Sequence, residues 1–450
     1  MNAFQAKELE LFKEKHSKSL SLWKKSLKYY PGGVNHNVRT FGLPLIDAYP
    51  IFLSSSSDIT LLDVDGIAYT DYWLGHYSQI LGHTNSIIKQ AVDERLLKGW
   101  MFGTVIEDQI LFAEKISSIA NAIEKLRFQT SGSESVMNAL RLSRAYTKRD
   151  IIAKVDLGWH GTNETYINGS NRKLTEVEDV DSLSKQKIIS FQLTQESIDH
   201  LFKDFGTKLA CVIIEPIIGS GGAFKVDVEL LKQLRESCDE YGVVLIFDEI
   251  ISGFRFQYGL YQDKIGIKPD LTTLGKIIGG GFSIGGLGGV SEIMDLADPS
   301  STKANKATIG GGTFSNHPVT IAAGIATLNV LHSKRDDFDK LNSLGNYFRD
   351  RLNSIFSDAN NNIIATNFGS LIFVNCLTKS PWNETIPDIE ILHTIDKKEQ
   401  AFLQLSLLNR NIFGNHGIGA LSFLHTKKVV DEASNTINEI VNSHNLRITT

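Results

Sequence analysis

One lysine, Lys276, stands inside the apolar, glycine-rich run LTTLGKIIGGGF (residues 271–282). Lysine is seldom buried, because its ammonium group loses hydration in an apolar site. When partly removed from water, its amine has a lowered pKa and can attack an aldehyde to form a Schiff base. The neighbouring glycines permit close approach of a flat ring or of another backbone segment. A lysine whose amine simply extends into solvent is the alternative.

A carboxylate occupies a comparable position, since Asp248 directly follows the apolar stretch Val243–Phe247. An ionised carboxylate is costly there unless a cation or a hydrogen-bond donor meets it. A protonated pyridine nitrogen would be a suitable partner. An aspartate that only caps the following loop explains the residues equally well.

A third stretch, QTSGSES (129–135), is typical of a strand end that turns into a helix. Gly132 would let the backbone turn tightly, and Ser133 could cap the helix while neighbouring N–H groups point outward. Such a turn is suited to a phosphate group. An ordinary helix N-cap is the alternative.

These three stretches fall within a region of alternating strands and helices, residues 86–330. Strands are predicted at 126–130, 151–155, 211–215 and 243–247, and helices at 134–147 and 228–241. Such alternation indicates an α/β domain with a mainly parallel sheet. Ligands of these sheets collect beyond the carboxyl ends of the strands, so the three stretches are expected to meet there.

The flanking regions are predicted to be separate parts of the chain. Residues 1–85 form a segment of helix and hairpin, with an amphipathic helix over residues 1–30 and a hairpin over residues 58–72. A long helical stretch covers residues 316–355, and residues 331–450 form a C-terminal α+β portion.

Composition narrows the class of partner. The 450-residue chain has a net charge of −5, which gives no reason to expect nucleic acid or an anionic membrane. Three scattered cysteines without a Cys/His cluster indicate neither disulfides nor a metal site. The charged N-terminus and the short apolar runs predict a soluble, cytoplasmic protein.

Two familiar glycine-rich motifs are absent. The chain has no GxGxxG, and Lys276 lacks the Ser/Thr and the spaced glycine of a Walker A loop. A phosphate anchor, an acid for a ring nitrogen and a lysine for an aldehyde remain. Pyridoxal 5′-phosphate needs these three partners.

The motifs and their order resemble the class-III aminotransferases of the fold-type-I pyridoxal-phosphate superfamily, and most closely the glutamate-1-semialdehyde 2,1-aminomutases. The similarity runs from about residue 22 to the C-terminus and is carried by PGGVNHNVRTF (31–41), QTSGSESVMNALRLSRAYT (129–147), WHG (159–161), VIIEP (212–216), FDEIISGFR (247–255), PDLTTLGKIIGGG (269–281) and GGTFSNHP (311–318). It implies a large domain with a seven-stranded sheet flanked by helices, and a smaller α+β domain built from both chain ends.

The resemblance also implies roles for individual residues. Lys276 would carry the cofactor as a Schiff base, and Asp248 would pair with the pyridinium. The ring would lie between Trp159, where the family usually has tyrosine, and Ile250. The remaining implied cofactor contacts are Ser131, Gly132, Ser133, His160, Gly312 and Thr313. Thr313 would reach the phosphate of the neighbouring subunit, which implies a homodimer with active sites at the subunit interface.

Three further residues receive no catalytic role. Glu215 and Ser220 lie near the cofactor in the family picture, and Arg255 is expected to be a structural ion-pair residue.

Four departures from the aminomutase pattern fall on the substrate side. His36-Asn37 replaces Ser-Pro, His76 stands where a tryptophan is expected, and Gly417 stands where a pocket glutamate is expected. The loop at 162–187 is shorter and more charged than its aminomutase counterpart.

Arg39 survives in this changed surrounding, and its guanidinium could hold a substrate carboxylate bidentately. His36, His76 and His416 suggest a polar acceptor, although ordinary core or surface histidines would also explain them.

The sequence therefore predicts an aminotransferase that moves an amino group between a small-molecule amino donor and an oxo or aldehyde acceptor by ping-pong chemistry. The near alternative is the aminomutase, which shifts an amino group within glutamate semialdehyde. A racemase or epimerase on the same scaffold is also open. The intact Lys276 and Asp248 disfavour a non-catalytic binding protein.

Overall fold

The computed structural model describes residues 1–163, 187–302, 306–359, 361–382 and 392–443. The chain divides into two compact units. The small unit comprises residues 1–85 and 340–450, and the large unit comprises residues 86–339. Among the described residues, no helix combines the length and the apolar character that a membrane crossing requires.

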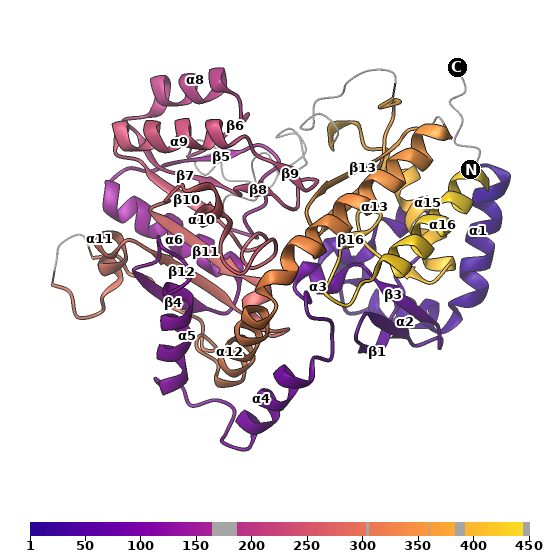
Figure 1. Cartoon of the computed structure of the whole chain (residues 1–450), viewed down its shortest axis with the longest axis horizontal. Coiled ribbons are helices and arrows are strands. Elements are labelled where there is room, and N and C mark those ends of the chain that lie inside the picture. The colour runs from indigo at the N-terminus through magenta and orange to yellow at the C-terminus, as the bar shows by residue number, and fades with distance from the viewer. Residues whose placement is uncertain (164–186, 303–305, 360, 383–391, 444–450) are drawn as a thin grey trace. The chain divides into compact units, whose positions relative to one another are not determined.

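A seven-stranded sheet forms the centre of the large unit, in the order β4-β12-β11-β10-β7-β5-β6 (Figure 1). Its strands are β4 (Lys125–Gln129), β5 (Ile151–Val155), β6 (Ile188–Phe191), β7 (Leu209–Ile214), β10 (Val244–Asp248), β11 (Leu271–Gly275) and β12 (Gly285–Gly289). Among the described pairs, the two antiparallel ones both include β12, so β12 is the one strand of reversed direction. The predicted mainly parallel sheet is confirmed.

Two central strands have the composition that burial on both faces requires. Every residue of β7 and of β10 is buried, as expected for a parallel sheet covered by helices. Strand β12 has the sequence GGLGG instead. A side chain at Gly285 would collide with the Ser131 carbonyl, so glycine lets the start of helix α6 approach the sheet. Side-chain periodicity gives no sign of such a strand.

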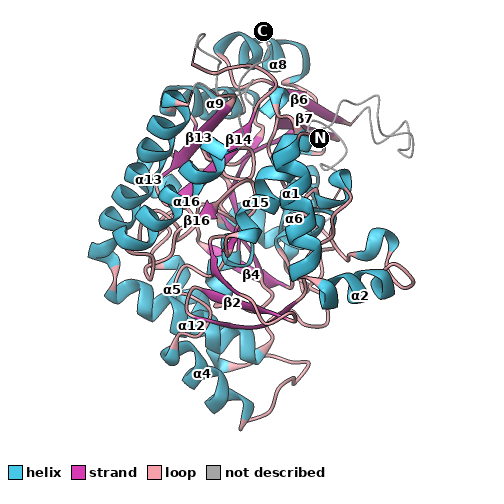
Figure 2. Ribbon diagram, turned by 90° about the vertical axis from the view of Figure 1, so that its right-hand side faces the viewer, coloured by secondary structure: helices cyan, strands magenta, loops and turns pink. Residues whose placement is uncertain are grey.

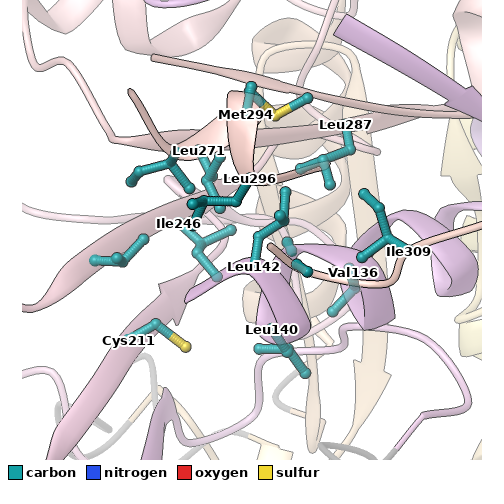
Figure 3. Packing of buried hydrophobic residues seen from close by; sticks show 14 of the residues in the cluster. Val136, Leu140, Leu142, Cys211, Ile246, Leu271, Leu287, Met294, Leu296 and Ile309 are labelled. Carbon is teal, nitrogen blue, oxygen red and sulfur yellow. The ribbon is translucent and has the colours of Figure 1, made fainter. Parts of the chain in front are cut away.

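Helices of the large unit cover this sheet. They are α4 (Ser86–Leu96), α5 (Glu107–Ser117), α6 (Gly132–Thr147), α8 (Gln195–Phe205), α9 (Val228–Tyr241), α10 (Tyr261–Ile265), α11 (Ser291–Met294) and α12 (Pro318–Ser333), and the short 3₁₀ helix η6 (Lys276–Gly279) follows β11. Helix α6 places Val136, Leu140 and neighbouring apolar residues against Cys211, Ile246 and Leu287 of the strands (Figure 3).

The small unit contains two sheets and its own helices (Figure 2). One sheet has the order β1-β2-β3-β15 and the other β13-β14-β16. The strands are β1 (Leu53–Ser57), β2 (Thr60–Asp63), β3 (Ala68–Asp71), β13 (Ile363–Phe368), β14 (Leu371–Cys376), β15 (Ile412–Phe413) and β16 (Gly419–Ala420). The helices are α1 (Ala3–Lys15), α2 (Ser17–Ser26), α3 (Leu74–Tyr77), α13 (Phe338–Asp358, in this unit from residue 340), α15 (Lys397–Asn409) and α16 (Lys427–Ser443).

Two predicted long helices are each divided in the structure. The first is interrupted at His16, whose backbone leaves the helical region. Its buried ring lies 2.7 Å from the Phe12 carbonyl and 2.7 Å from the Tyr69 hydroxyl, and the bend satisfies both nitrogens. The stretch 316–355 divides into α12 and α13 at the polar segment Arg335–Asp337.

The α6–sheet contact supports a stability prediction. Leu140→Ala removes a fully buried side chain from the core and should lower the free energy of unfolding by about 2–5 kcal/mol, measured by denaturant unfolding. Arg141→Ala is the matched control, because Arg141 is the adjacent, exposed residue of the same helix. Equal effects of the two changes would contradict the packing described.

Candidate active site

The carboxyl ends of the central strands bring several polar residues to one face of the sheet. The strand register pairs Lys154 with Ile213 and Ile213 with Ile246. Both isoleucines belong to the core that packs on α6. Side chains alternate along a strand, so Asp248, two residues beyond Ile246, lies on the same face as Lys154.

Asp248 is the last residue of β10 and its side chain is held by three donors. Its Oδ1 accepts from Thr273 Oγ1 at 2.9 Å and from the Ile250 N–H at 3.1 Å. Its Oδ2 lies 2.8 Å from His160 Nδ1, which must donate because an ionised carboxylate only accepts. These bonds offset the hydration that the 2% exposed Asp248 loses.

The hydrogen bond to Asp248 also fixes the tautomer of His160. Burial lowers the pKa of His160, while Asp248 opposes this shift. The neutral ring therefore carries its proton on Nδ1. Its Nε2 atom is buried and has no hydrogen-bond partner among the described residues.

Lys276 directly follows β11 and is half-buried. Burial lowers the pKa of its amine, against the opposing effects of Asp248 and Glu215. Its backbone φ of 47° is in the left-handed region, a strained conformation for a residue with a side chain. The Lys276 amine forms no hydrogen bond or ion pair with any other described residue.

The cap of α6 differs from the prediction. Ser131 rather than Ser133 is the N-cap, since its Oγ accepts from the Glu134 N–H at 3.3 Å. The Glu134 carboxylate in turn accepts from the Ser131 N–H at 3.2 Å, which completes a capping box. This arrangement needs an acid three residues after the cap, and only Ser131 has one. Ser133 Oγ instead accepts from the Thr162 N–H at 3.1 Å.

Gly132 serves close packing rather than a tight turn. A Cβ at Gly132 would lie 2.5 Å from Ile250 Cδ1, so glycine lets Ile250 lie against the start of α6. The first N–H groups of a helix have no acceptor within it. Those of Gly132 and Ser133, with the positive end of the helix dipole, form a site that fits a phosphate.

The loop after β5 carries two more predicted site residues. Trp159 is partly exposed, as is Ile250. Gly161 has a φ of 84°, and a side chain there would collide with Ser133. The loop is thereby held against the start of α6.

Gly312 and the glycine run after Lys276 contact the large unit's own helices. A Cβ at Gly312 would lie 2.8 Å from Thr130 Oγ1, and Thr313 beside it is exposed. Gly280, with a φ of 58°, lies so close to α12 that a Cβ would be 2.5 Å from Thr327 Oγ1. The glycines after Lys276 were expected to allow close approach of a flat ring or of another backbone segment. Gly280 allows the close approach of another backbone segment.

Sequence reasoning missed three polar residues of this face. Thr273 and Lys154 were not singled out, and Glu215 received no role. Glu215 is 3% exposed, and burial, reinforced by repulsion from Asp248, raises its pKa to about 7. The available signal was a charged residue within or directly after an apolar strand, as in IIAKV and CVIIE.

The predicted substrate residues His36, Arg39 and His76 belong to the small unit. The His36 and His76 rings lie 5.4 Å apart, and the Trp73 ring is 4.2 Å from His76. His416 is 6.3 Å from Trp73. The structure thus brings the three histidines together around one tryptophan.

Burial favours the neutral form of two imidazoles of this cluster, those of His36 and His416. Burial, and secondarily the charge of Arg39, lowers the pKa of His36. Burial lowers the pKa of His416 to about 4. Arg39 is exposed, and its guanidinium forms no ion pair with the described residues. The cluster therefore offers the positive charge of Arg39 beside the neutral rings of His36 and His416.

His76 is positioned by a strained turn. The four residues Leu74 to Tyr77 have φ values of 48°, 57°, 60° and 70°, a left-handed turn that costs about 1–2 kcal/mol per non-glycine residue. Asp71 stabilises its start by accepting the Trp73 N–H at 2.8 Å and the Leu74 N–H at 3.1 Å. Strain of this kind is concentrated at functional sites.

The two remaining departures from the aminomutase pattern differ in what the structure describes. A Cβ at Gly417, whose φ is 82°, would lie 2.5 Å from Val374 Cβ, so this backbone is built for glycine. Of the loop at 162–187, residues 164–186 lie outside the described part of the chain.

Comparison with known proteins identifies the family. The family model described as "Aminotransferase class-III" matches residues 46–397. The chain belongs to the class-III aminotransferases. It is similar to the glutamate-1-semialdehyde 2,1-aminomutase of Methanococcoides burtonii, with 38% identity over 347 residues (76% of this chain, 80% of the relative). The aminomutase of Caldivirga maquilingensis is 31% identical over 432 residues (93% and 96%).

Solved structures of transaminases share the fold of this chain. An ω-transaminase from Sphaerobacter thermophilus has a TM-score of 0.85 at 28% identity, covering 96% of this chain and 99% of its own. A β-phenylalanine aminotransferase from Variovorax paradoxus has a TM-score of 0.86 at 26% identity, covering 98% and 97%.

The cofactor of this class-III aminotransferase is pyridoxal 5′-phosphate. The residues of the large unit fit it. Asp248 supplies a buried carboxylate for a ring nitrogen, and Lys276 supplies an amine without a hydrogen bond to the described residues. The start of α6 supplies N–H groups for a phosphate.

The lowered pKa of Lys276 leads to a labelling prediction. A lower pKa leaves a larger fraction of neutral, nucleophilic amine at a given pH. In cofactor-free protein, reductive methylation at Lys276 should therefore persist as the pH is lowered toward neutrality, while the exposed Lys203 loses reactivity first. Peptide mass spectrometry measures both rates in one sample. Parallel pH profiles for the two lysines would contradict the shift.

Proposed function

We propose that this class-III aminotransferase transfers an amino group from one small-molecule donor to a separate oxo or aldehyde acceptor. The observation that carries the proposal is the contact of His36 with His76, beside Trp73. His36-Asn37 stands where the aminomutase pattern has Ser-Pro, and His76 stands where it has a tryptophan. The cofactor-side residues Lys276 and Asp248 keep the family pattern. A changed substrate side beside an intact Lys276 and Asp248 favours a different substrate with the same general chemistry.

The proposed mechanism divides the work among residues of the large unit. Bound cofactor supplies an electron sink for the substrate carbon that loses its proton. Asp248 keeps the ring nitrogen protonated, and His160 orients Asp248. The amine of Lys276 carries the cofactor at rest and, once released by substrate, moves the proton. General acid–base transfer of this kind contributes about 10²–10⁴-fold to the rate.

The other proposed cofactor contacts hold the group in place. Ser131, Gly132 and Ser133 at the start of α6 bind the phosphate. Trp159 and Ile250 confine the ring, with His160 beside it. Gly312 and Thr313 complete the phosphate site of a neighbouring subunit.

The small-unit cluster supports a substrate with one carboxylate and one uncharged polar group. Arg39 would bind the carboxylate bidentately. The neutral ring of His36 can donate and accept hydrogen bonds without adding charge, and the ring of His76 lies beside it. A second carboxylate would lack a cation there.

The decisive test is the half-reaction with an amino donor alone. The enzyme should convert its cofactor to the amine form and release one free oxo acid per active site, followed by absorbance and by keto-acid assay. Lys276→Ala should abolish both signals, because the attachment point and the proton carrier are lost.

Arg39→Lys keeps the charge but loses the bidentate geometry, and should raise KM more than it lowers kcat.

The aminomutase reaction is the second candidate, because the relatives of 38% and 31% identity carry that name. The same assay with glutamate semialdehyde separates the two. Product formed by an internal amino shift, with no oxo acid released from any donor of the panel, would overturn the proposal of intermolecular transfer.

We further propose that the enzyme is a homodimer. Large apolar side chains are exposed around a groove of about 790 Å³ in the large unit, which is lined by residues of α4, α5 and α12. Phe102 and Val105 line this groove and have exposed fractions of 46% and 75%. Leu97 and Trp100 lie within two residues of its lining residue Lys98 in the sequence, with exposed fractions of 89% and 67%. Exposed patches of this kind mark interaction surfaces, and a second copy of the chain is the proposed occupant.

Leu97→Glu should shift the protein from dimer to monomer in sedimentation velocity, because a charge would be buried in the interface. Activity should fall with the dimer fraction if Thr313 serves the neighbouring subunit. Tyr29→Glu, at a residue of the small unit with an exposed fraction of 72%, is the control. A wild-type protein that sediments as a monomer and is fully active would rule out this part of the proposal.

A further inference from the structure

One peptide group beside the candidate active site is held at both ends by buried charged side chains. Lys154 Nζ donates to the Gly158 carbonyl at 2.9 Å. Glu215 Oε1 accepts from the Trp159 N–H at 2.9 Å. The carbonyl and the N–H belong to the same peptide bond. We propose that Lys154 and Glu215 act together as positioning residues that set Trp159 and His160 in the cofactor site.

Lys154 is a charged residue in the interior of the sheet. It is the fourth residue of β5, paired on either side with Ser190 of β6 and Ile213 of β7. Its side chain is 1% exposed, and burial lowers its pKa to about 8, against Asp156 and Glu215. A buried ammonium is costly unless it is paired and hydrogen-bonded. The Gly158 carbonyl supplies one such partner.

Glu215 is enclosed in the same way, one residue beyond β7. Besides the Trp159 N–H, it accepts from the Gly219 N–H at 3.0 Å and from Ser220 Oγ at 3.4 Å. The carboxylate thus ties the loop after β5 to the chain after β7. The family resemblance gave Glu215 no role, and these bonds supply one.

The peptide dipole matches the two charges. Its carbonyl end points to the cation, and its N–H end points to the carboxylate, so each charge stabilises the orientation that the other favours. Rotation of this peptide would break both bonds at once. The pair therefore specifies one backbone orientation at the residue where the site begins.

The loop needs such a constraint, because its backbone is strained. Leu157 has a φ of 68° although it carries a side chain, and Gly161 has a φ of 84°. Further anchors follow along the loop: His160 bonds to Asp248, and the Thr162 N–H donates to Ser133. The two bonds to the Gly158–Trp159 peptide thus fix the backbone from which Trp159 would face the ring.

The charge of Lys154 has a second effect on the site. It contributes, after burial, to the lowered pKa of His160. A neutral His160 donates to Asp248 without neutralising it, which leaves the negative charge of Asp248 for a ring nitrogen. Lys154 thus acts on the cofactor through His160, and Glu215 acts through Trp159. Neither residue is assigned contact with substrate.

The test uses the full-length protein as purified, labelled with ¹⁵N-tryptophan. The chain has five tryptophans, so the backbone N–H of Trp159 is one of few signals. Around the neutral point this signal should titrate with Glu215, whose pKa is about 7, and the titration should vanish in Glu215→Gln. Asp248, Lys276, His160, Lys154 and Asp156 are the other titratable groups around the pair.

A double-mutant cycle measures the coupling. Lys154→Met and Glu215→Gln should each speed hydrogen exchange of the Trp159 amide roughly 10- to 100-fold, the loss expected for a hydrogen bond to a charged group. In the double variant, exchange of the Trp159 amide should be accelerated by less than the product of the two single-variant factors, because no unpaired charge then remains buried. Lys208→Met, at an exposed lysine before β7, is the control.

The inference rests on the proposed function for the role of the site. The titration and the exchange rates do not depend on which amino donor the enzyme accepts, so they can fail or succeed independently of the proposed function. If Lys154→Met does not fold, the wild-type titration and Glu215→Gln still decide. A Trp159 amide that does not titrate in the wild type, or additive effects in the cycle, would overturn the proposal.

Discussion

Keeping a charged Asp248 at the end of a fully buried strand is the constraint on which the candidate site depends. The carboxylate loses its hydration there, and three donors replace it: Thr273, the Ile250 N–H and His160. Each donor comes from a different element around β10. The hydrogen bonds that stabilise the charge therefore also fix the relative positions of β11, the loop after β10 and the loop after β5.

On this face of the sheet, a layer of apolar residues is followed by a layer of charged residues. Nearest the core lie the apolar residues that pack on α6. Beyond them, Lys154, Glu215 and Asp248 are almost completely buried, and Lys276 is half-buried. Opposite charges alternate closely enough to shift one another's pKa values. Perturbed groups of this kind gather at functional sites, because their hydrogen bonds and charges are arranged for a charged ligand rather than for stability alone.

Much of the fold could be predicted from the sequence. Apolar strands such as β7 and β10 and amphipathic helices such as α6 and α9 are visible as patterns, and the strand ends point to Asp248 and Lys276. Strand β12 was not visible, because GGLGG has no side-chain alternation and is specified by the close approach of α6. The helix cap was predicted at Ser133, two residues after the observed cap Ser131, because the pairing of Ser131 with Glu134 was not recognised. The left-handed turn at His76 was not visible either; its start is stabilised by local hydrogen bonds from the Trp73 and Leu74 N–H groups to the Asp71 carboxylate.

The central claim is that Lys276 is the residue that carries the cofactor aldehyde. It is tested most directly by treating the enzyme with borohydride in the presence of pyridoxal 5′-phosphate and mapping the modified peptide by mass spectrometry. The large unit contains a built-in competitor, because Lys154 is also buried and its pKa is lowered to about 8. The account predicts a single pyridoxyl group on Lys276. Modification of Lys154 instead, or of exposed lysines only, would contradict it.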